Sequence, residues 1–344
     1  MKKNFFGKTK AGVDTHLFTF SRDNISISVT DYGAALVNLL VKNKEGEFVD
    51  VVLGYDDVTG YENDEYFFGV PVGRSANRIG GAAFEINGKA YNLDKNEFGN
   101  NLHSGFDFYN KRIWKVHSQE EYKITFSLHS PDGDQGYPGA VDIYASYQLT
   151  EDGTLVLDYS GTPDKDTIMN LTNHSYFNLN GHDSGLILKH HITIDADFYT
   201  QIDEEYIPTG KLVDVTGTPM DFKAGRVIET DLDSDYESMG LGGGYDHNWV
   251  FTPRDGLRPV AKAVGDRTGI TMEVSTDLPG TQFYIGNFIV EAKGKAGAIY
   301  KKRSGFCFET QYTPDAIHHE NFKSPICKAG TEYKSTTTFR FEVL

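Results

Sequence analysis

Two segments of the 344-residue chain carry groups that can exchange protons. The first, residues 170–179, reads Asn-Leu-Thr-Asn-His-Ser-Tyr-Phe-Asn-Leu and contains His174 and Tyr176. The second, residues 305–312, reads Gly-Phe-Cys-Phe-Glu-Thr-Gln-Tyr and contains Glu309 among apolar residues. A histidine and a carboxylate on either side of a substrate can act as general acid and general base, each contributing roughly 10²–10⁴-fold. The alternative for Glu309 is an edge-strand side chain that points into solvent.

Four further polar segments offer side chains that donate or accept hydrogen bonds. They provide Asn77 and Arg78 within residues 73–80, His103 within 100–105, Asp246 within 244–249 and Gln282 within 279–284. Each segment alone also fits a surface turn or an ordinary structural histidine. Together, and with Trp249 and Tyr284 nearby, they are typical of a site for a neutral, polyhydroxylated ligand. Phosphate-binding glycine motifs and a nucleophile elbow are absent from the sequence.

Alternation along a strand would bring these groups to one surface. If residues 170–179 are extended, His174 and Tyr176 share a face with Asn170, Thr172 and Asn178. In residues 305–312 the same period places Glu309 with Cys307 and Gln311, opposite the phenylalanines. A row of Asn, His and Tyr is either a water-facing sheet surface or the lining of a polar cleft, and the residue types favour the cleft.

The elements that must position these groups are predominantly strands. Period-two patterns recur at residues 26–30, 123–128 and 154–159, each bounded by Gly, Asp, Asn or Pro. Helical periodicity is scarce, and short helices are predicted only near residues 56–61 and after residues 223–225. The 36 Gly, 20 Tyr and 23 Phe also favour strands and turns. We therefore predict an all-β fold, a single large antiparallel β-sandwich; since no linker interrupts it, residues 1–344 are expected to form one domain.

Charge and cysteine content exclude several partners. The chain has 33 Lys+Arg and 49 Asp+Glu, a net charge of −16, which disfavours nucleic acid and anionic lipid. No window approaches eighteen consecutive apolar residues, so no membrane span is predicted. The two cysteines, Cys307 and Cys327, are expected to be reduced thiols in a cytoplasmic protein, although a single bridge stays open. A nucleophilic Cys307 is the weaker alternative, because no basic neighbour in the sequence would lower its pKa.

These segments together resemble the aldose 1-epimerase (galactose mutarotase) family. Residues 170–179 match the most distinctive run of that family, and residues 73–80 resemble its Gly-Arg-x-Ala-Asn-Arg-Ile turn. Residues 102–105 resemble its Leu-His-Gly-Gly run, with Ser104 in place of the first glycine. Residues 245–247 and 308–311 match in order and approximate spacing, so the resemblance covers essentially the whole chain.

The resemblance implies a supersandwich fold with an open cleft that binds a free hexose and interconverts its α and β anomers. It implies no metal and no organic cofactor. We expect a small-molecule sugar as the partner, and a monomer or homodimer. In residue terms it implies Glu309 as general base at the C1 hydroxyl, His174 as general acid at the ring oxygen O5, and His103 beside them. The hydroxyl-binding residues implied are Asn77, Arg78, His103, Asp246 and Gln282, with Tyr176 lining the site.

Three other functions are compatible with the same residues. Two histidines and one glutamate are also a common metal set, which would suit a metal-dependent hydrolase or isomerase. A hexose 6-phosphate epimerase would need extra basic residues at the rim, and a sugar-binding module would lack catalysis. We expect carboxylates such as Asp246 to raise the pKa of His174, giving a bell-shaped pH profile with Glu309 on the acid limb and His174 on the alkaline limb. Ser104 is expected to influence sugar preference rather than catalysis.

Overall fold

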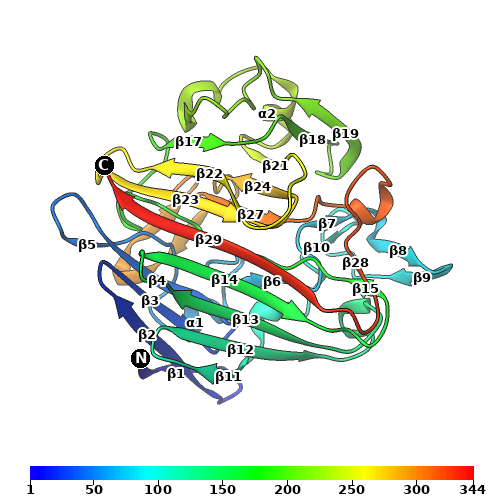
Figure 1. Ribbon diagram of the computed structural model, residues 1–344, viewed down its shortest axis with the longest axis horizontal. Helices are drawn as coiled ribbons and strands as arrows, with labels where there is room; N and C mark the ends of the chain where they lie inside the picture. The colour runs from blue at the N-terminus through cyan, green and yellow to red at the C-terminus, as the bar shows by residue number, and fades with distance from the viewer.

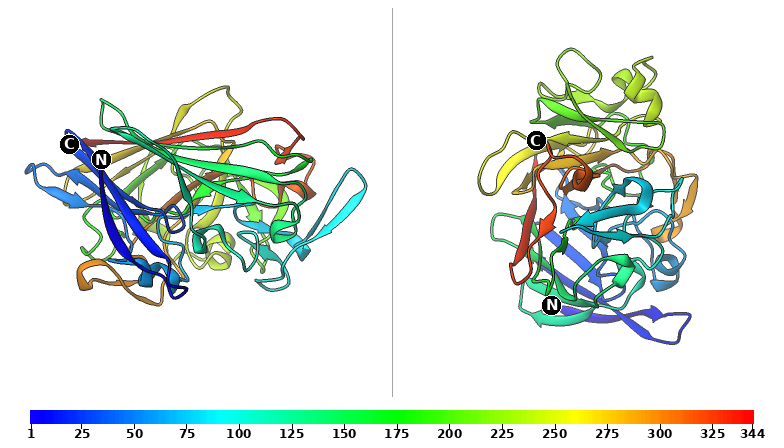
Figure 2. Two further views of the ribbon diagram at one scale, coloured as in Figure 1. Left: turned by 90° about the horizontal axis from the view of Figure 1, so that it is seen from below. Right: turned by 90° about the vertical axis from the view of Figure 1, so that its right-hand side faces the viewer.

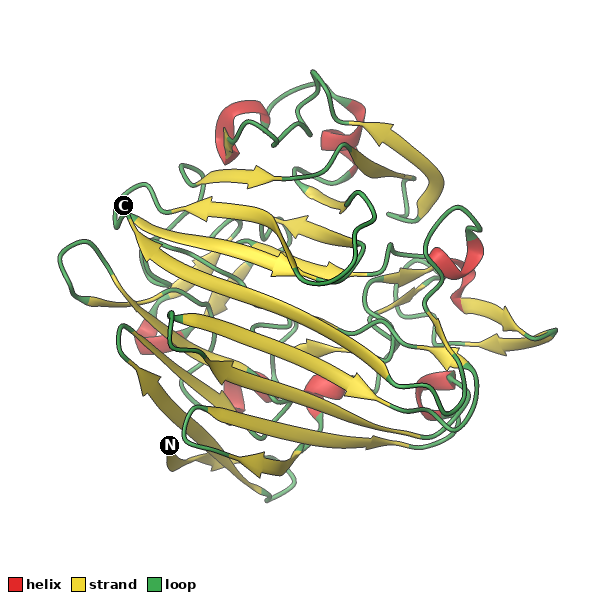
Figure 3. Ribbon diagram, viewed as in Figure 1, coloured by secondary structure: helices red, strands yellow, loops and turns green.

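The computed structural model describes all residues, 1–344. Strands form because apolar and polar side chains alternate along the chain, so that one face of each sheet is buried. In β13 (Val141–Leu149) every second residue is buried, beginning with Val141 and ending with Leu149. Figure 3 shows a molecule made mainly of strands. Its helical elements are two short α-helices and six 3₁₀ turns.

The largest sheet has nine antiparallel strands, and its long members cross the front of Figure 1. Figure 2 shows the same sheet from below, as a layer of long green, yellow and red strands with other strands beneath it. Its order is β11 (Lys115–Gln119), β12 (Lys123–Ser130), β13, β14 (Thr154–Gly161), β29 (Tyr333–Val343), β23 (Ile270–Thr276), β22 (Arg258–Val264), β17 (His191–Ile194) and β20 (Arg226–Val227).

Two five-stranded sheets complete the main architecture. The first is β1 (Lys2–Lys8), β2 (Asp14–Arg22), β3 (Ile25–Thr30), β4 (Leu36–Lys42) and β5 (Phe48–Asp50). The second, in spatial order, is β19 (Pro208–Asp214), β18 (Phe198–Ile202), β21 (Asp246–Val250), β24 (Gly280–Tyr284) and β27 (Cys307–Gln311). All three large sheets contribute side chains to one core of 55 buried residues, so the prediction of an all-β sandwich is confirmed.

Five short two-stranded ladders accompany the three large sheets. They are β6 (Pro71–Val72) with β16 (Thr172–Asn173), β7 (Arg78–Ile79) with β10 (Asn101–Leu102), β8 (Ala83–Ile86) with β9 (Lys89–Asn92), β15 (Thr167–Ile168) with β28 (Ile326–Cys327), and β25 (Glu291–Lys293) with β26 (Ile299–Lys301). Two of them, β6–β16 and β7–β10, place the polar segments predicted from the sequence beside the second five-stranded sheet.

The helices are short. Helix α1 (Val58–Glu62) confirms the helix predicted near residues 56–61, and it begins where the Asp57 side chain accepts hydrogen bonds from the backbone N–H groups of Thr59 and Gly60. After residues 223–225 the chain forms β20 and then a 3₁₀ turn at Ile228–Asp231 rather than an α-helix. Helix α2 (Glu237–Leu241) precedes β21, and no helix in the structure is long and apolar enough to cross a membrane.

Candidate active site

A cleft of about 240 Å³ lies where the second five-stranded sheet meets the β7–β10 and β6–β16 ladders. Its walls include all eight site residues predicted from the sequence, and seven others. The lining residues are Glu65, Tyr66, Phe67, Asn77, Arg78, Glu97, Leu102, His103, His174, Tyr176, Asp246, Gln282, Tyr284, Phe288 and Glu309.

Strand register explains how three of these side chains meet. Gln282 on β24 lies directly opposite Glu309 on β27, and Asp246 on β21 pairs with Tyr284, two residues further along β24. Residues two apart on a strand share a face, so Asp246, Gln282 and Glu309 all point into the cleft. The predicted face of residues 307–311 is thereby confirmed, because Phe306 and Phe308 lie in the main core on the other side.

The segment 170–179 is less regular than the sequence predicts. Only Thr172 and Asn173 form a ladder, and Phe177 makes isolated bridges to Val52 and Phe306. Side chains still alternate between the two faces at residues 174–177. The rings of His174 and Tyr176 stack at 5.0 Å in the cleft, while Phe177 is in the core. The outer members of the predicted row do not reach the cleft; the side-chain amide of Asn178, for example, donates to the backbone carbonyls of Gly185 and Ser304.

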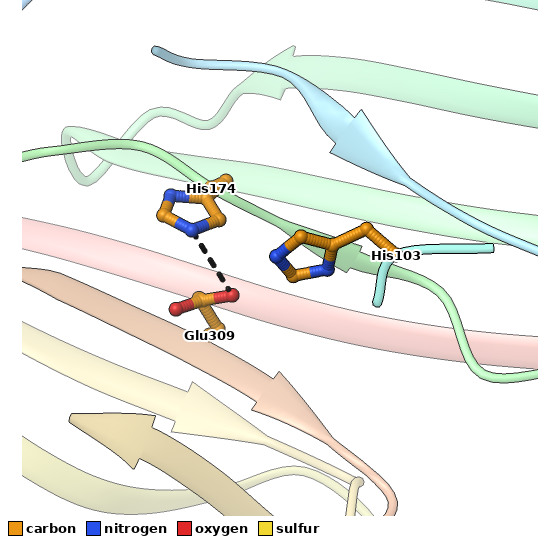
Figure 4. Close-up of side chains that lie close together, drawn as sticks. All are labelled: His103, His174 and Glu309. Carbon is orange, nitrogen blue, oxygen red and sulfur yellow. Dashed lines mark ion pairs between the residues drawn. The ribbon is translucent and has the colours of Figure 1, made fainter. Parts of the chain in front are cut away.

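His174 and Glu309 face each other across the cleft. The Nε2 atom of His174 is 3.6 Å from Oε2 of Glu309, and both side chains are buried (Figure 4). His103 approaches from the β10 side, with its ring 5.6 Å from that of His174 and nearly perpendicular to it. One carboxyl group and two imidazole rings thus converge on one point.

His103 is held in a single tautomer by the backbone. Its Nδ1 accepts a hydrogen bond from the backbone N–H of Asn77 at 3.1 Å, so in the neutral ring the proton is on Nε2. This contact exists because the β7–β10 ladder pairs Leu102 with Arg78, next to the two residues concerned. Burial, followed by the charges of His174 and Arg78, holds the pKa of His103 well below its ordinary value. His103 is therefore a neutral hydrogen-bond donor.

Two further polar pairs line the cleft. Arg78 makes a two-pronged ion pair with Glu97, at 2.5 Å from Nε and 2.9 Å from Nη2. Nε2 of Gln282 donates to Oδ1 of Asp246 at 2.7 Å. Oε1 of Gln282 and Oε2 of Glu309 have no hydrogen-bond partner within the protein, although both are buried. Buried acceptors are normally satisfied, so these two atoms are suited to accept from hydroxyl groups of a ligand.

Comparison with known proteins agrees with this geometry. A family model described as aldose 1-epimerase matches residues 16–340. The chain is 38% identical over 343 residues to a galactose mutarotase of Mus musculus, covering 99% of this chain and 98% of that protein. It is 35% identical over 336 residues to an aldose 1-epimerase of Haemophilus influenzae, covering 96% and 97%. A solved aldose epimerase homologue from C. elegans matches with a TM-score of 0.89 at 26% identity, covering 96% of this chain and 99% of that chain.

The chain belongs to the aldose 1-epimerase family. It is accordingly an isomerase, and the family resemblance seen in the sequence is confirmed. The surroundings of the candidate residues in this epimerase change two expectations, the pKa of His174 and the effect of Ser104.

The pKa shift of His174 is opposite to the one expected from the sequence. Burial lowers the pKa of His174 to about 4, whereas nearby carboxylates were expected to raise it. Burial also raises the pKa of Glu309 well above its ordinary value; the negative charge of Asp246 adds to this effect and Arg78 partly offsets it. Desolvation prevails because the two side chains are almost completely enclosed. Burial in the cleft therefore favours a neutral carboxyl and a neutral imidazole.

A bell-shaped pH profile is still expected, with the two limbs exchanged. Between the two pKa values the pair holds one exchangeable proton. Below about pH 4 a second proton binds His174 and no base remains, whereas above the raised pKa of Glu309 the proton is lost and no acid remains. We expect kcat/KM, corrected for spontaneous mutarotation, to fall below about pH 4 on the acid side. An acid limb centred near pH 6.5 would contradict this assignment.

Ser104 does not line the cleft of the epimerase, so the expected effect on sugar preference has no structural support. Its hydroxyl accepts from the backbone N–H of Ser75 at 2.8 Å and donates to the Ser75 carbonyl at 3.0 Å. The side chain therefore ties the turn after β10 to the turn before β7. Trp249 does not line the cleft either. It is buried in the core, and its indole N–H donates to the Met220 carbonyl. The aromatic surface of the cleft comes instead from Phe67, Tyr176, Tyr284 and other rings.

The structure also bears on the metal alternative. The donor atoms of His103, His174 and Glu309 lie within 4.8 Å of one another, so their spacing alone would permit a shared ion. However, Nδ1 of His103 already accepts from the Asn77 N–H, and its Nε2 carries the proton. A neutral His103 thus has no free lone pair for a metal, and ligating histidines normally donate rather than accept through their second nitrogen.

Chelation is therefore expected to leave the epimerase active. Dialysis against EDTA, followed by polarimetric assay, should change kcat by less than twofold, because His103 offers no free lone pair and only two of the three groups could hold an ion. Metal content of the purified protein, measured by mass spectrometry, provides the control. A stoichiometric transition metal together with activity that chelation abolishes and zinc restores would contradict the cofactor-free reaction.

Proposed function

We propose that this epimerase interconverts the α and β anomers of a free hexose, such as galactose or glucose, by opening and reclosing the sugar ring. The observation that carries the proposal is the buried pair of Glu309 and His174, 3.6 Å apart in a cleft lined by hydrogen-bonding side chains. Mutarotation moves two protons and leaves no lasting charge, so one acid and one base are sufficient. The names galactose mutarotase and aldose 1-epimerase printed for its relatives support the same reaction.

In the proposed mechanism Glu309 takes the proton from the C1 hydroxyl while Nε2 of His174 gives a proton to O5. The bond between C1 and O5 breaks, the aldehyde turns about the C1–C2 bond, and the ring closes on the other face with the roles reversed. The reacting form is the carboxylate with the imidazolium, so the one exchangeable proton of the pair first passes from Glu309 to Nε2 of His174. Once this form is reached, each shift strengthens its group. A raised pKa makes the Glu309 carboxylate a stronger base, and a lowered pKa makes the His174 imidazolium a stronger acid.

The other lining groups have binding roles in this proposal. Nε2–H of neutral His103 donates a hydrogen bond near O5 or C1. The remaining hydroxyls are bound by the unpartnered Oε1 of Gln282 and by Asn77, Arg78 and Asp246. Tyr176 backs the His174 ring. Rigid ion pairing of Arg78 with Glu97 keeps its guanidinium in place before a sugar arrives.

The charge of the cleft favours a free sugar over a sugar phosphate. Glu65, Glu97, Asp246 and Glu309 line it, whereas Arg78 is the single lysine or arginine there and is paired with Glu97. A phosphate would meet carboxyl groups without an available cation, and the net charge of −16 adds to the repulsion. No observation supports the hexose 6-phosphate alternative or a purely binding role.

Polarimetry on freshly dissolved sugars tests the function. The protein should accelerate the optical rotation change of α-D-galactose and α-D-glucose far above the spontaneous rate, and should act on α-D-glucose 6-phosphate with a much lower kcat/KM. Absence of acceleration with every aldose, despite measurable sugar binding, would show a binding module instead. A preference for the phosphate would show the alternative epimerase.

Three expectations from the sequence belong to the same proposal. We propose one domain spanning residues 1–344, supported by the pairing of β29, at the end of the chain, with both β14 and β23. We propose a cytoplasmic location, supported by two buried free thiols, Cys307 and Cys327. We propose a monomer or homodimer, which light scattering would test.

A further inference from the structure

The two nitrogens of the His174 ring face different residues of the same strand. Nε2 faces Glu309, whereas Nδ1 is 3.5 Å from Sγ of Cys307. Cys307 and Glu309 are two residues apart on β27, so they share a face, and both side chains are buried. Cys307 takes no direct part in the proposed mechanism, yet its sulfur is the only side-chain hydrogen-bonding partner at Nδ1.

The ring has little freedom to exchange these two contacts. Tyr176 stacks on it at 5.0 Å and Phe67 at 5.8 Å, with interplanar angles of 27° in both cases. The backbone of His174 is also fixed, because its N–H donates to the Val70 carbonyl and its carbonyl accepts from Gly69. A ring flip would require the surrounding aromatic side chains to move, so Nδ1 stays beside the sulfur.

The proposed proton transfer requires Nδ1 of His174 to carry a proton. For Nε2 to give a proton to O5 and later take it back, Nδ1 must keep its own proton throughout, and a buried N–H requires an acceptor. We infer that Cys307 is a positioning residue of this epimerase: its sulfur accepts the Nδ1–H of His174 and so commits Nε2 to the proton exchange. The inference rests on the proposed function, because it concerns the acid of that reaction.

The choice of sulfur has a chemical consequence. A thiol sulfur is a weak acceptor, and it stabilises an imidazolium much less than the carboxylate that often holds a catalytic histidine. Burial raises the pKa of Cys307 well above its ordinary value, so the thiol stays neutral. His174 consequently remains a strong acid, which suits protonation of a weakly basic ring oxygen. The titratable groups that face its ring from the surrounding elements are Cys307, Glu309, His103, Tyr176 and Tyr284.

Substitution of Cys307 tests the inference, with Cys327 as a matched control. Cys327 is also a buried free thiol, but it lies on β28, where its sulfur donates to the Thr331 carbonyl. We expect Cys307→Ala to lower kcat about fivefold, as for the loss of one hydrogen bond, with KM changed less than twofold. Cys327→Ala should leave both unchanged. An unchanged kcat in Cys307→Ala would overturn the inference.

Two readouts separate a positioning role from packing. We expect Cys307→Asp to move the acid limb of kcat/KM upward by about one pH unit or more, because a carboxylate acceptor stabilises the imidazolium. In the wild-type protein, ¹⁵N NMR of the His174 ring should show Nδ1 protonated at neutral pH, with the signals assigned by their loss in His174→Asn. A neutral ring protonated on Nε2 alone would overturn the inference even if Cys307→Asp does not fold. A wild-type protein without mutarotase activity would instead refute the proposed function.

Discussion

Glu309→Gln is expected to lower kcat by roughly 10²–10⁴-fold while preserving the fold and the cleft. Glutamine has the shape of glutamate and can still hydrogen-bond a sugar hydroxyl, but it cannot take the proton from C1–OH. KM should therefore change little. The small residual rate should increase as pH falls, because His174 alone then acts, and it is an acid only below its pKa of about 4. Polarimetry from pH 3 to 9, with the spontaneous rate subtracted, measures both effects.

The same variant makes a prediction about stability. The folded state binds the Glu309 proton more tightly than the unfolded chain does, because the folded pKa is raised. Glu309 therefore contributes most stability below its unfolded pKa, and that contribution is lost as pH rises towards the folded value. A neutral glutamine avoids this loss, so Glu309→Gln should have a Tm at pH 7 equal to or above that of the wild type.

A surface variant completes this comparison. Glu120 is exposed at the end of β11, so Glu120→Gln should alter neither kcat nor Tm. Full activity in Glu309→Gln would show that the base is a different residue. A lower Tm with a matching loss of folded protein would show that the glutamate has a structural role instead.

The sequence predicts this site well where a local pattern decides the structure. Alternation in residues 307–311 correctly places Glu309 in the cleft and Phe308 in the core, because a strand enforces the period of two. The prediction for residues 170–179 is only partly correct. In that segment only Thr172 and Asn173 pair in a ladder and only Asn170 and Phe177 form isolated bridges, yet His174 and Tyr176 still lie on one side.

Features that depend on distant contacts could not be predicted. Glu97 lies in a turn without periodicity, and its role beside Arg78 appears only when the chain has folded. Phe67 has a positive φ of 63°, a conformation no sequence pattern indicates for phenylalanine, and its ring lies against those of both cleft histidines, His103 and His174. The pKa shifts of His174 and Glu309 have the same origin. They follow from the degree of burial, which composition and spacing do not determine.

His174→Asn is expected to cause the other large loss, a decrease in kcat of roughly 10²–10⁴-fold. Asparagine can donate a hydrogen bond to O5, but it cannot transfer a proton, so the C1–O5 bond must break without acid assistance. Because Glu309 then acts alone and works only as a carboxylate, the residual rate should rise with pH towards its raised pKa. Wild-type activity should fall over that same alkaline range.

The direction of these residual pH profiles distinguishes the two roles, since loss of activity alone does not. Loss of the base should leave a rate that increases towards acid, and loss of the acid should leave a rate that increases towards alkali. His129→Asn is the matched control, because His129 is an exposed histidine on β12 that pairs with Asp142 at 2.7 Å, outside the cleft. If His174→Asn instead keeps the wild-type pH profile at a lower rate, the proton for O5 comes from another group. The residue to replace next would then be His103, because its neutral ring carries a proton on Nε2.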